Sequence, residues 1–316
     1  GPALVAYNNE IVTDADWTGL QTINSSSKKA DITKTGKYGS GFRSTFHLTD
    51  TPEILSRSHL AIFDPLAIFH AAGGIRHNFV ETQQSLSNHL QPYASVSPQA
   101  LNGPFNGTAI RLPLRTHDSE RLHAKAISAD EIKQIMLDFI HGELGIVMLF
   151  LRSVSSIVLK DISATGDITI LAAARLDRSP EVVLENSTTH KATIIVCVPG
   201  VKTTVQTWRV VETLDSVTDY TQLLDEKLGY RTSGILAREK MTPRVGLAAP
   251  LDGLSDGGRL FTFLPLPIST GYPCCINGTF ALTVDRQHLL NPEEQVAERS
   301  HDRLRIEWNK LVFSKT

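Results

Sequence analysis

The sequence has little cysteine, no charge bias and no long apolar run. Cysteine occurs only at Cys197, Cys274 and Cys275, without metal-ligand spacing, so we expect reduced thiols and a cytoplasmic protein. The 31 basic residues nearly balance the 33 acidic ones, which gives no electrostatic reason to expect nucleic acid or an anionic membrane as a partner. The most apolar run is broken by Arg152 and is too short to span a bilayer.

What is present is typical of a globular chain of 316 residues, with 41% hydrophobic and 20% charged residues. This length predicts two domains. The polar stretch "THDSERLHAKAIS" suits a linker, so the predicted domains are residues 1–115 and 116–316. The first mixes strands with a glycine-rich loop, and the second is richer in strands and ends in an amphipathic helix. The predicted fold class is therefore α/β (α+β).

Two helix starts carry a local signal. Thr13 with Asp16, and Ser128 with Glu131, are spaced as in a capping box, in which each side chain satisfies a backbone N–H of the other residue. Residues 3–8, which precede the first pair, predict a short buried strand.

Two other stretches have a less regular pattern. Residues 107–115 alternate as a strand does, and Pro113 within them predicts an edge strand or a bulge, because proline cannot donate to a ladder. Residues 145–151, "GIVMLFL", predict either a short buried helix or a strand.

Three glycines lie close together in "GKYGSGFRSTFHLTD", at Gly36, Gly39 and Gly41. The spacing from Gly36 to Gly41 fits the Walker pattern, but Phe42 occupies the place of its lysine, which excludes the ordinary phosphate-loop enzyme. The spacing also differs from the dinucleotide fingerprint. An anion can still bind free N–H groups where the following helix starts. Alternatively, the glycines only supply positive φ angles to a turn.

The order of four segments, "YNNEIVTDADW", "INSSSKK", "GKYGSGFRSTFHLTD" and "FNGTAIRLPL", resembles the gyrase, histidine kinase and MutL ATPase superfamily. Within it, the chain is most similar to the ninety-kilodalton heat-shock chaperones, in their sacsin-type version. The later stretches "LFLRSVSSIVL" and "GRLFTFLPLPISTGYPCCINGTFALTVDRQHLL" extend this resemblance over most of the chain. It implies a partial two-layer α/β sandwich of the chaperone ATPase type, followed by an α/β middle-type domain.

The resemblance also implies a cofactor, ATP or ADP with magnesium. The glycine loop would lie over the phosphates, a glycine-threonine pair beside the base, and residues 25–35 would form a lid. The implied nucleotide-binding residues are Asn8, Asn9, Gly36, Gly39, Ser40, Gly41, Phe42, Gly107 and Thr108.

The chain departs from the family pattern in two places. The adenine-reading turn of the family is DxGxG, whereas "YNNEIVT" has neither Asp nor Gly there, as in sacsin-type sequences, so an amide of Asn8 or Asn9 would have to meet the base. The catalytic Glu and the magnesium-ligating Asn of the family lie on a helix that we expect upstream of Gly1. Hydrolysis needs both functions, so we expect no metal ligand and little ATPase activity from these residues alone.

One candidate lies in the second predicted domain. The stretch "FALTVDRQHLL" resembles the catalytic loop of the chaperone middle domain, which implies that Arg286 senses the γ-phosphate. The permanent charge and planar fork of arginine suit this role. Alternatively, Arg286 pairs at the surface with a nearby carboxylate such as Asp285 or Glu293.

Three functional hypotheses follow. The first is a chaperone module that uses ATP or ADP as a conformational switch and acts on polypeptide clients or with co-chaperones, as the resemblance alone implies. The second is a degenerate, non-hydrolysing scaffold that holds protein partners, which the Asp-less turn favours. The third is an ATPase in DNA repair or chromatin work, against which the absence of a basic bias counts.

Overall fold

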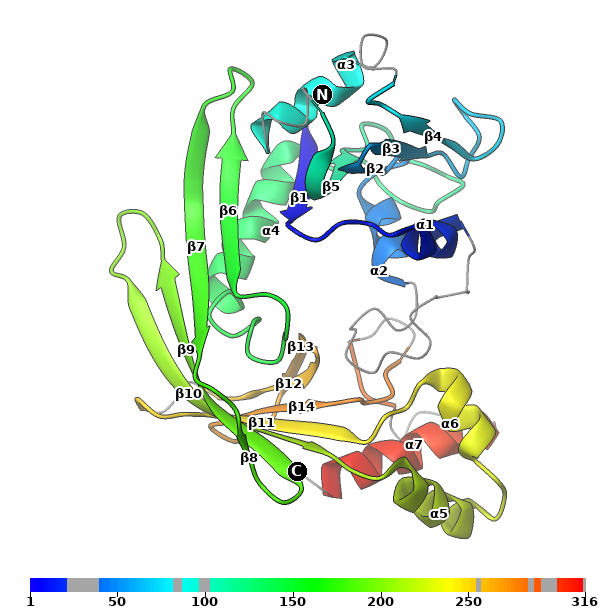
Figure 1. Ribbon diagram of the computed structural model, residues 1–316, viewed down its shortest axis with the longest axis vertical. Helices are drawn as coiled ribbons and strands as arrows, with labels where there is room; N and C mark the ends of the chain where they lie inside the picture. The colour runs from blue at the N-terminus through cyan, green and yellow to red at the C-terminus, as the bar shows by residue number, and fades with distance from the viewer. Residues whose placement is uncertain are drawn as a thin grey trace. The chain divides into compact units, whose positions relative to one another are not determined.

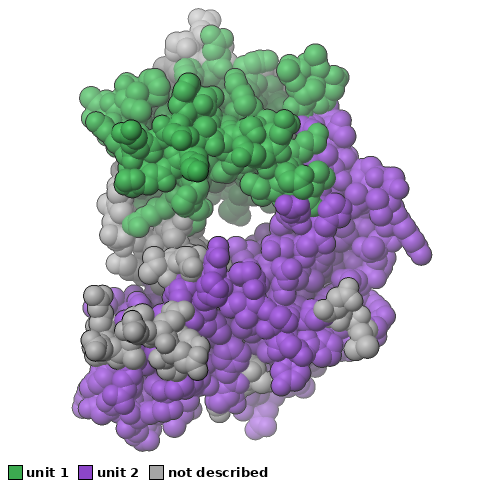
Figure 2. Space-filling model, turned by 180° about the vertical axis from the view of Figure 1, so that it is seen from behind, with its two compact units in different colours: residues 1–137, 162–167 green, residues 138–161, 168–316 purple. Residues whose placement is uncertain are grey.

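The computed structural model describes these residues: 1–21, 40–81, 87–96, 103–253, 257–283, 287–290 and 300–314. The fold is α+β, as predicted, and it divides into two compact units (Figure 2). Unit 1 comprises residues 1–137 and 162–167, and unit 2 comprises residues 138–161 and 168–316. One helix, α4 (Ala129–Gly142), continues across the boundary between them.

The described part of unit 1 is built on a five-stranded sheet in which every neighbouring pair is antiparallel. Its strands, in spatial order, are β1 (Ala3–Asn8), β5 (Phe105–Pro113), β2 (Glu53–Arg57), β3 (His59–Phe63) and β4 (Gly74–Asn78). The helical segments are α1 (Asp14–Gln21), α2 (Ser40–Arg43), η1 (Ser44–His47), α3 (Ser87–Leu90) and η2 (Gln91–Ser95).

Both faces of this sheet are covered. Ile54 pairs with Ala61 and Ile110, and these side chains form a cluster with Trp17 of α1 and Phe42 of α2. On the opposite face Leu55, Leu60 and Ala109 pack with residues from the α3–η2 region, namely Leu90 and Tyr93, and with Phe79 and Phe105. Figure 1 shows α1 and α2 together beside the sheet. Successive residues of β2 therefore point to opposite faces of the sheet and pack in two different hydrophobic clusters.

Both predicted capping boxes are confirmed. Asp16 N–H donates to Thr13 Oγ1 at 3.2 Å and Thr13 N–H donates to Asp16 Oδ2 at 3.2 Å, at the start of α1. Ser128 and Glu131 exchange the same bonds at the start of α4, and Glu131 also accepts from the Ser128 hydroxyl. These bonds lower the pKa of the Glu131 carboxyl.

Pro113 predicts an edge strand or a bulge, and neither is found there. Strand β5 lies inside the sheet, between β1 and β2, and its pairing with β1 is regular through Pro113. Pro113 is its last residue and faces Ala3 of β1, two positions past the last residue paired with β2, which is Arg111. The missing N–H therefore interrupts no ladder, and a proline is tolerated at the end of a central strand.

Unit 2 contains a nine-stranded sheet within the residues that the structure describes. Its main path runs β13 (Leu264–Ser269), β12 (Arg259–Thr262), β14 (Cys275–Gly278), β11 (Arg244–Pro250), β10 (Thr204–Leu214), β9 (Ser187–Cys197), β7 (Ile168–Arg178) and β6 (Ser156–Ile162). The short β8 (Val182–Val183) pairs with β9.

Three helices, α5 (Val217–Leu228), α6 (Ser233–Glu239) and α7 (Ser300–Ser314), lie together beside this sheet (Figure 1). Their buried side chains, including Leu224, Leu236 and Trp308, form one cluster with Val245 and Ile276 of the sheet. Trp308 donates its Nε1–H to the buried carbonyl of Thr279 at 2.7 Å. No helix among the described ranges is both long and apolar enough to cross a membrane.

The opposite face of this sheet is covered by residues 143–150. The sequence predicts a helix or a strand for residues 145–151, but the structure shows a run of turns, closed by bonds such as Leu149 N–H to the Ile146 carbonyl at 3.0 Å. Phe150 packs on Phe261 with ring centroids 5.0 Å apart. A Cβ on Gly246 would lie only 3.0 Å from the Phe150 ring. The apolar run thus packs closely on the sheet without forming a regular helix or strand.

The adjacent leucines of α5 test the core of unit 2. Leu224 is fully buried, whereas the Leu223 side chain is 45% exposed. We expect Leu224→Ala to lower the free energy of unfolding by about 2–5 kcal/mol, since it removes buried methyl groups and leaves a cavity. Leu223→Ala should change it by less than about 0.5 kcal/mol. Urea denaturation of both variants measures this, and equal losses would contradict the packing described.

Candidate functional site

The sheet of unit 1 brings two of the predicted site segments together. Asn8, the last residue of β1, lies directly opposite Thr108 of β5. The turn after β1 is closed by the Asn8 side chain, whose Oδ1 accepts the N–H of Glu10 at 3.0 Å. Asn8 and Asn9 are exposed. The asparagine turn and the glycine-threonine pair, about 100 residues apart in the chain, are therefore neighbours in space.

Gly107 allows the two strands to approach here. Its φ angle is 152°, a value that residues with side chains rarely adopt. A Cβ at this position would lie 2.7 Å from the Asn8 carbonyl oxygen and 2.7 Å from Cε2 of Tyr7. The close contact between β1 and β5 is thus sufficient to require a glycine at position 107, independently of any ligand.

Two buried hydroxyls hold the turn in place. Ser56 Oγ accepts the N–H of Val12 at 3.0 Å and donates to the Gly107 carbonyl at 2.8 Å. Thr108 Oγ1 donates to the Glu10 carbonyl at 2.7 Å and lies 3.2 Å from Ser56 Oγ. Sequence reasoning identified Thr108 but missed Ser56, whose only signal is a polar residue within the buried stretch "EILSR".

The end of the glycine loop is anchored by an aromatic side chain. Phe42 packs on Phe63 and Phe46, with centroid distances of 4.8 and 6.2 Å. Gly41 is exposed, and no described atom lies within 4 Å of where its Cβ would be, so its backbone is open to an approaching ligand. Ser40 is the first residue of α2. Phe42 thus fixes this helix start on the sheet.

Four other predicted positions lie outside the described residues. These are Gly36 and Gly39 of the glycine loop, the lid at residues 25–35, and Arg286. Their roles remain predictions.

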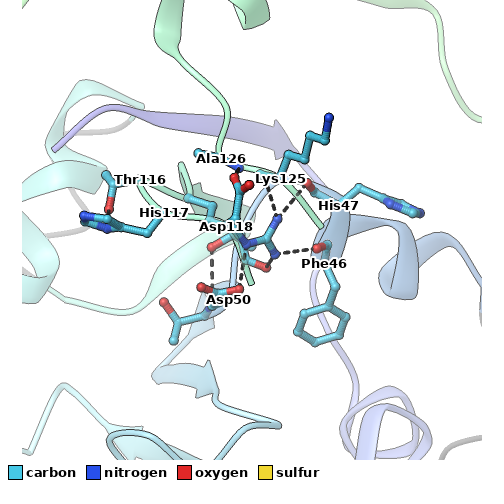
Figure 3. Close-up of polar contacts among 11 residues, drawn as sticks. Phe46, His47, Asp50, Thr116, His117, Asp118, Lys125 and Ala126 are labelled. Atoms are coloured by element: carbon cyan, nitrogen blue, oxygen red, sulfur yellow. Dashed lines mark hydrogen bonds and ion pairs between the residues drawn. The ribbon is translucent and has the colours of Figure 1, made fainter. Parts of the chain in front are cut away.

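Arg115 joins the segment after the glycine loop to the end of β5. Its side chain is almost completely buried. Nε donates to Asp50 Oδ1 at 2.8 Å, and the two terminal nitrogens donate to the carbonyls of Phe46, His47, Thr49 and Lys125, at 2.6, 3.0, 3.1 and 3.2 Å. All five donors of the guanidinium are therefore used. Figure 3 shows Phe46, His47, Asp50 and Lys125 around these contacts.

Backbone hydrogen bonds reinforce this junction. Arg115 N–H donates to the Leu48 carbonyl at 2.9 Å, and the Arg115 carbonyl accepts the N–H of Ile127 at 3.0 Å. Ile127 is followed by Ser128, which caps α4. One residue thus connects the helical segment behind the glycine loop to the start of α4. The sequence analysis did not single out Arg115.

The chemistry available at the turn is mainly that of neutral donors and acceptors. Apart from the exposed carboxylate of Glu10, the side chains described above are amides and hydroxyls, which suit hydrogen bonding to a base or sugar rather than neutralisation of phosphate charge. Across the described ranges, no group of three or more His, Cys, Asp or Glu side chains is arranged to hold a metal ion.

The chain thus has an α+β fold. Its unit 1 contains the turn after β1, the glycine-threonine pair of β5 and the short helix α2 that follows the glycine-rich loop. Residues 1–169 match the family model described as Sacsin domain, and the chain belongs to this family. Human sacsin is 31% identical over 332 aligned residues, which cover 92% of this chain but only 7% of the human protein. The sacsin-type resemblance is confirmed, and its implications for nucleotide remain predictions.

Arg115 provides a test of this junction. We expect Arg115→Met to destabilise unit 1 by about 3 kcal/mol or more, since each buried acceptor left without a partner costs roughly 1–3 kcal/mol. Arg115→Lys should lie between the wild type and Arg115→Met, because an ammonium offers three donors in place of five.

The matched control is Arg121→Met, which alters an exposed arginine of the same segment. Hydrogen exchange at the amides of Arg115 and Ile127 measures the local effect, and urea denaturation measures the global one. If Arg115→Met behaved like Arg121→Met in both, the junction would have no stabilising role.

Proposed function

We propose that this chain is a chaperone module of a sacsin-like protein, in which ATP or ADP acts as a conformational switch and polypeptides are the clients. The observation that carries the proposal is the pairing of Asn8 with Thr108, which places the turn beside the glycine-threonine pair. This is the neighbourhood that the resemblance to the heat-shock chaperones implies for a base. A cytoplasmic location agrees with the scarce cysteine.

The nucleotide would be held mainly by neutral groups. The exposed amides of Asn8 and Asn9 can donate to and accept from a base. The open backbone at Gly41 and the following turn of helix suit a phosphate, with Gly36 and Gly39 as further predicted contacts. The described side chains thus suit a base, and the backbone at Gly41 suits a phosphate. Magnesium would arrive with the phosphates, since these residues include no metal-binding cluster.

A route for the switch exists within unit 1. Arg115 binds the carbonyls of Phe46, His47 and Thr49, just behind the helix start at Ser40, and also that of Lys125, just before α4. A displacement of α2 and η1 on nucleotide binding would therefore act directly on the residues that lead into α4. Because α4 crosses the boundary between the units, this route supports a switch rather than simple storage of nucleotide.

The second candidate function is a non-hydrolysing scaffold. One observation favours it: the Thr108 hydroxyl donates to the Glu10 carbonyl, and Asn8 Oδ1 accepts from Glu10 N–H, so both groups already have partners within the protein. An ATPase in DNA repair or chromatin work is disfavoured by the balanced charge.

Calorimetric titration with ADP and magnesium separates these proposals. We expect saturable binding to the wild-type chain, and a loss of affinity of about tenfold or more in Asn8→Ala/Asn9→Ala, because amide contacts to the base are removed. The control is Asn186→Ala, an exposed asparagine in unit 2. If the wild-type chain gave no saturable heat, the nucleotide-switch proposal would be refuted and the scaffold proposal would remain.

Arg286 tests the predicted catalytic loop. In a form extended upstream of Gly1, to include the helix expected there, Arg286→Ala should lower ATP turnover by about 100-fold or more and leave ADP affinity unchanged, as for an arginine that contacts only the γ-phosphate. Arg209→Ala, which alters an exposed arginine of β10, is the control. An equal loss of turnover and ADP binding in Arg286→Ala would refute the assignment.

A further inference from the structure

Strand β5 contains a bulge at an asparagine-glycine pair, Asn106 and Gly107. In the pairing of β5 with β2, the register shifts between Phe105 and Thr108, so the two residues between them have no counterpart in β2. The pairing of β5 with β1 ends at Thr108 and does not include them either. These two residues are thus outside the regular register on both sides of a central strand.

An asparagine that precedes a glycine can rearrange without an enzyme. The backbone nitrogen of the glycine loses its proton to hydroxide and attacks Cγ of the asparagine. The bond from Cγ to the side-chain nitrogen breaks, and ammonia leaves with a proton from water. Water then opens the cyclic imide at either carbonyl and gives aspartate or isoaspartate, so nothing is oxidised or reduced. Glycine favours the first step because it has no side chain and its backbone is unusually free.

Asn106 meets the conditions for this reaction. It is exposed, and its side chain makes no hydrogen bond with another described residue. Because the bulge is outside the regular register, movement of the Gly107 nitrogen toward Cγ of Asn106 separates no registered pair of residues. The Ser56 hydroxyl binds the Gly107 carbonyl, which belongs to the next peptide along the chain and not to the nitrogen that would react.

A second asparagine-glycine pair, Asn277 and Gly278 of β14, is in a setting that opposes the reaction. Asn277 is only 2% exposed, and its Oδ1 accepts the N–H of Phe263 at 2.9 Å. Both residues of the pair are in register with β11. A Cβ on Gly278 would lie 2.7 Å from the Phe280 ring, so this backbone is closely packed. The side chain and the backbone nitrogen can meet here only if the strand opens locally.

We propose that Asn106 is a site of spontaneous modification to aspartate and isoaspartate, and that the fold protects Asn277 from the same reaction. The two sites share the same dipeptide, so the difference between them comes from the structure. The reaction needs no nucleotide, and its test is therefore separate from that of the proposed function.

The modification has a structural consequence for the turn after β1. Isoaspartate inserts a methylene group into the main chain directly before Gly107. Space there is limited, since a Cβ on Gly107 would lie 2.7 Å from the Asn8 carbonyl oxygen. The Ser56 hydroxyl binds Gly107 and also accepts the N–H of Val12. A displaced Gly107 would therefore loosen the turn through Ser56.

The test is incubation of the folded chain at mildly alkaline pH, followed by peptide mapping. Tandem mass spectrometry locates each asparagine whose side-chain NH2 has been replaced by OH. A digest of the same protein, incubated in parallel, gives the rates without the fold, and there we expect Asn106 and Asn277 to react alike. In the folded chain, Asn106 should react at least about tenfold faster than Asn277, because Asn277 reacts only after local opening.

Asn106→Gln is the control variant, because glutamine forms the corresponding larger ring far more slowly and the exposed position tolerates it. After incubation, hydrogen exchange at the Val12 amide should be faster in the wild type than in this variant. The third asparagine-glycine pair begins at Asn102, outside the described residues, and fragment masses distinguish it from Asn106. Equal rates at Asn106 and Asn277 in the folded chain would overturn the proposal, and unchanged exchange at Val12 would refute its structural consequence.

Discussion

The hydrogen bonds of one buried guanidinium fix the segment behind the glycine loop. Four of the five acceptors that surround Arg115 are backbone carbonyls, and the fifth is the Asp50 carboxylate. Because a carbonyl is available at every residue, these contacts do not depend on the side chains at Phe46, His47 and Lys125. They depend on Arg115 and on the carboxylate of Asp50. Burial strengthens each of the bonds of this guanidinium.

The buried polar groups beside the turn of unit 1 all have partners within the protein, whereas one buried side chain of unit 2 has none among the described residues. In unit 1, Ser56, Thr108 and Arg115 all bind partners within the protein, and the exposed amides of Asn8 and Asn9 lie at the surface. In unit 2, the buried His190 has no hydrogen-bond partner for either ring nitrogen among the described residues. A fully satisfied hydrogen-bond network makes a region rigid, as we infer for the turn of unit 1.

Local features of the fold were predictable from the sequence, and distant contacts were not. The capping boxes at Thr13 and Ser128 follow from residues three positions apart. The place of β5 in the sheet depends on strand order, which Pro113 alone does not determine. Ser56 and Arg115 were missed for the same reason: the partners of their side chains lie 44 or more residues away in the chain, with the exception of Lys125. The run at residues 145–151 was ambiguous because periodicity does not distinguish buried segments.

The division of the chain has a consequence for how this fold is synthesised. Unit 1 includes residues 162–167, which are the end of β6 and the turn that leads to β7, although the chain has by then entered unit 2. A ribosome therefore completes unit 1 only after it has made the first strand of the larger sheet. A chain that ended at the polar linker would lack these residues of unit 1.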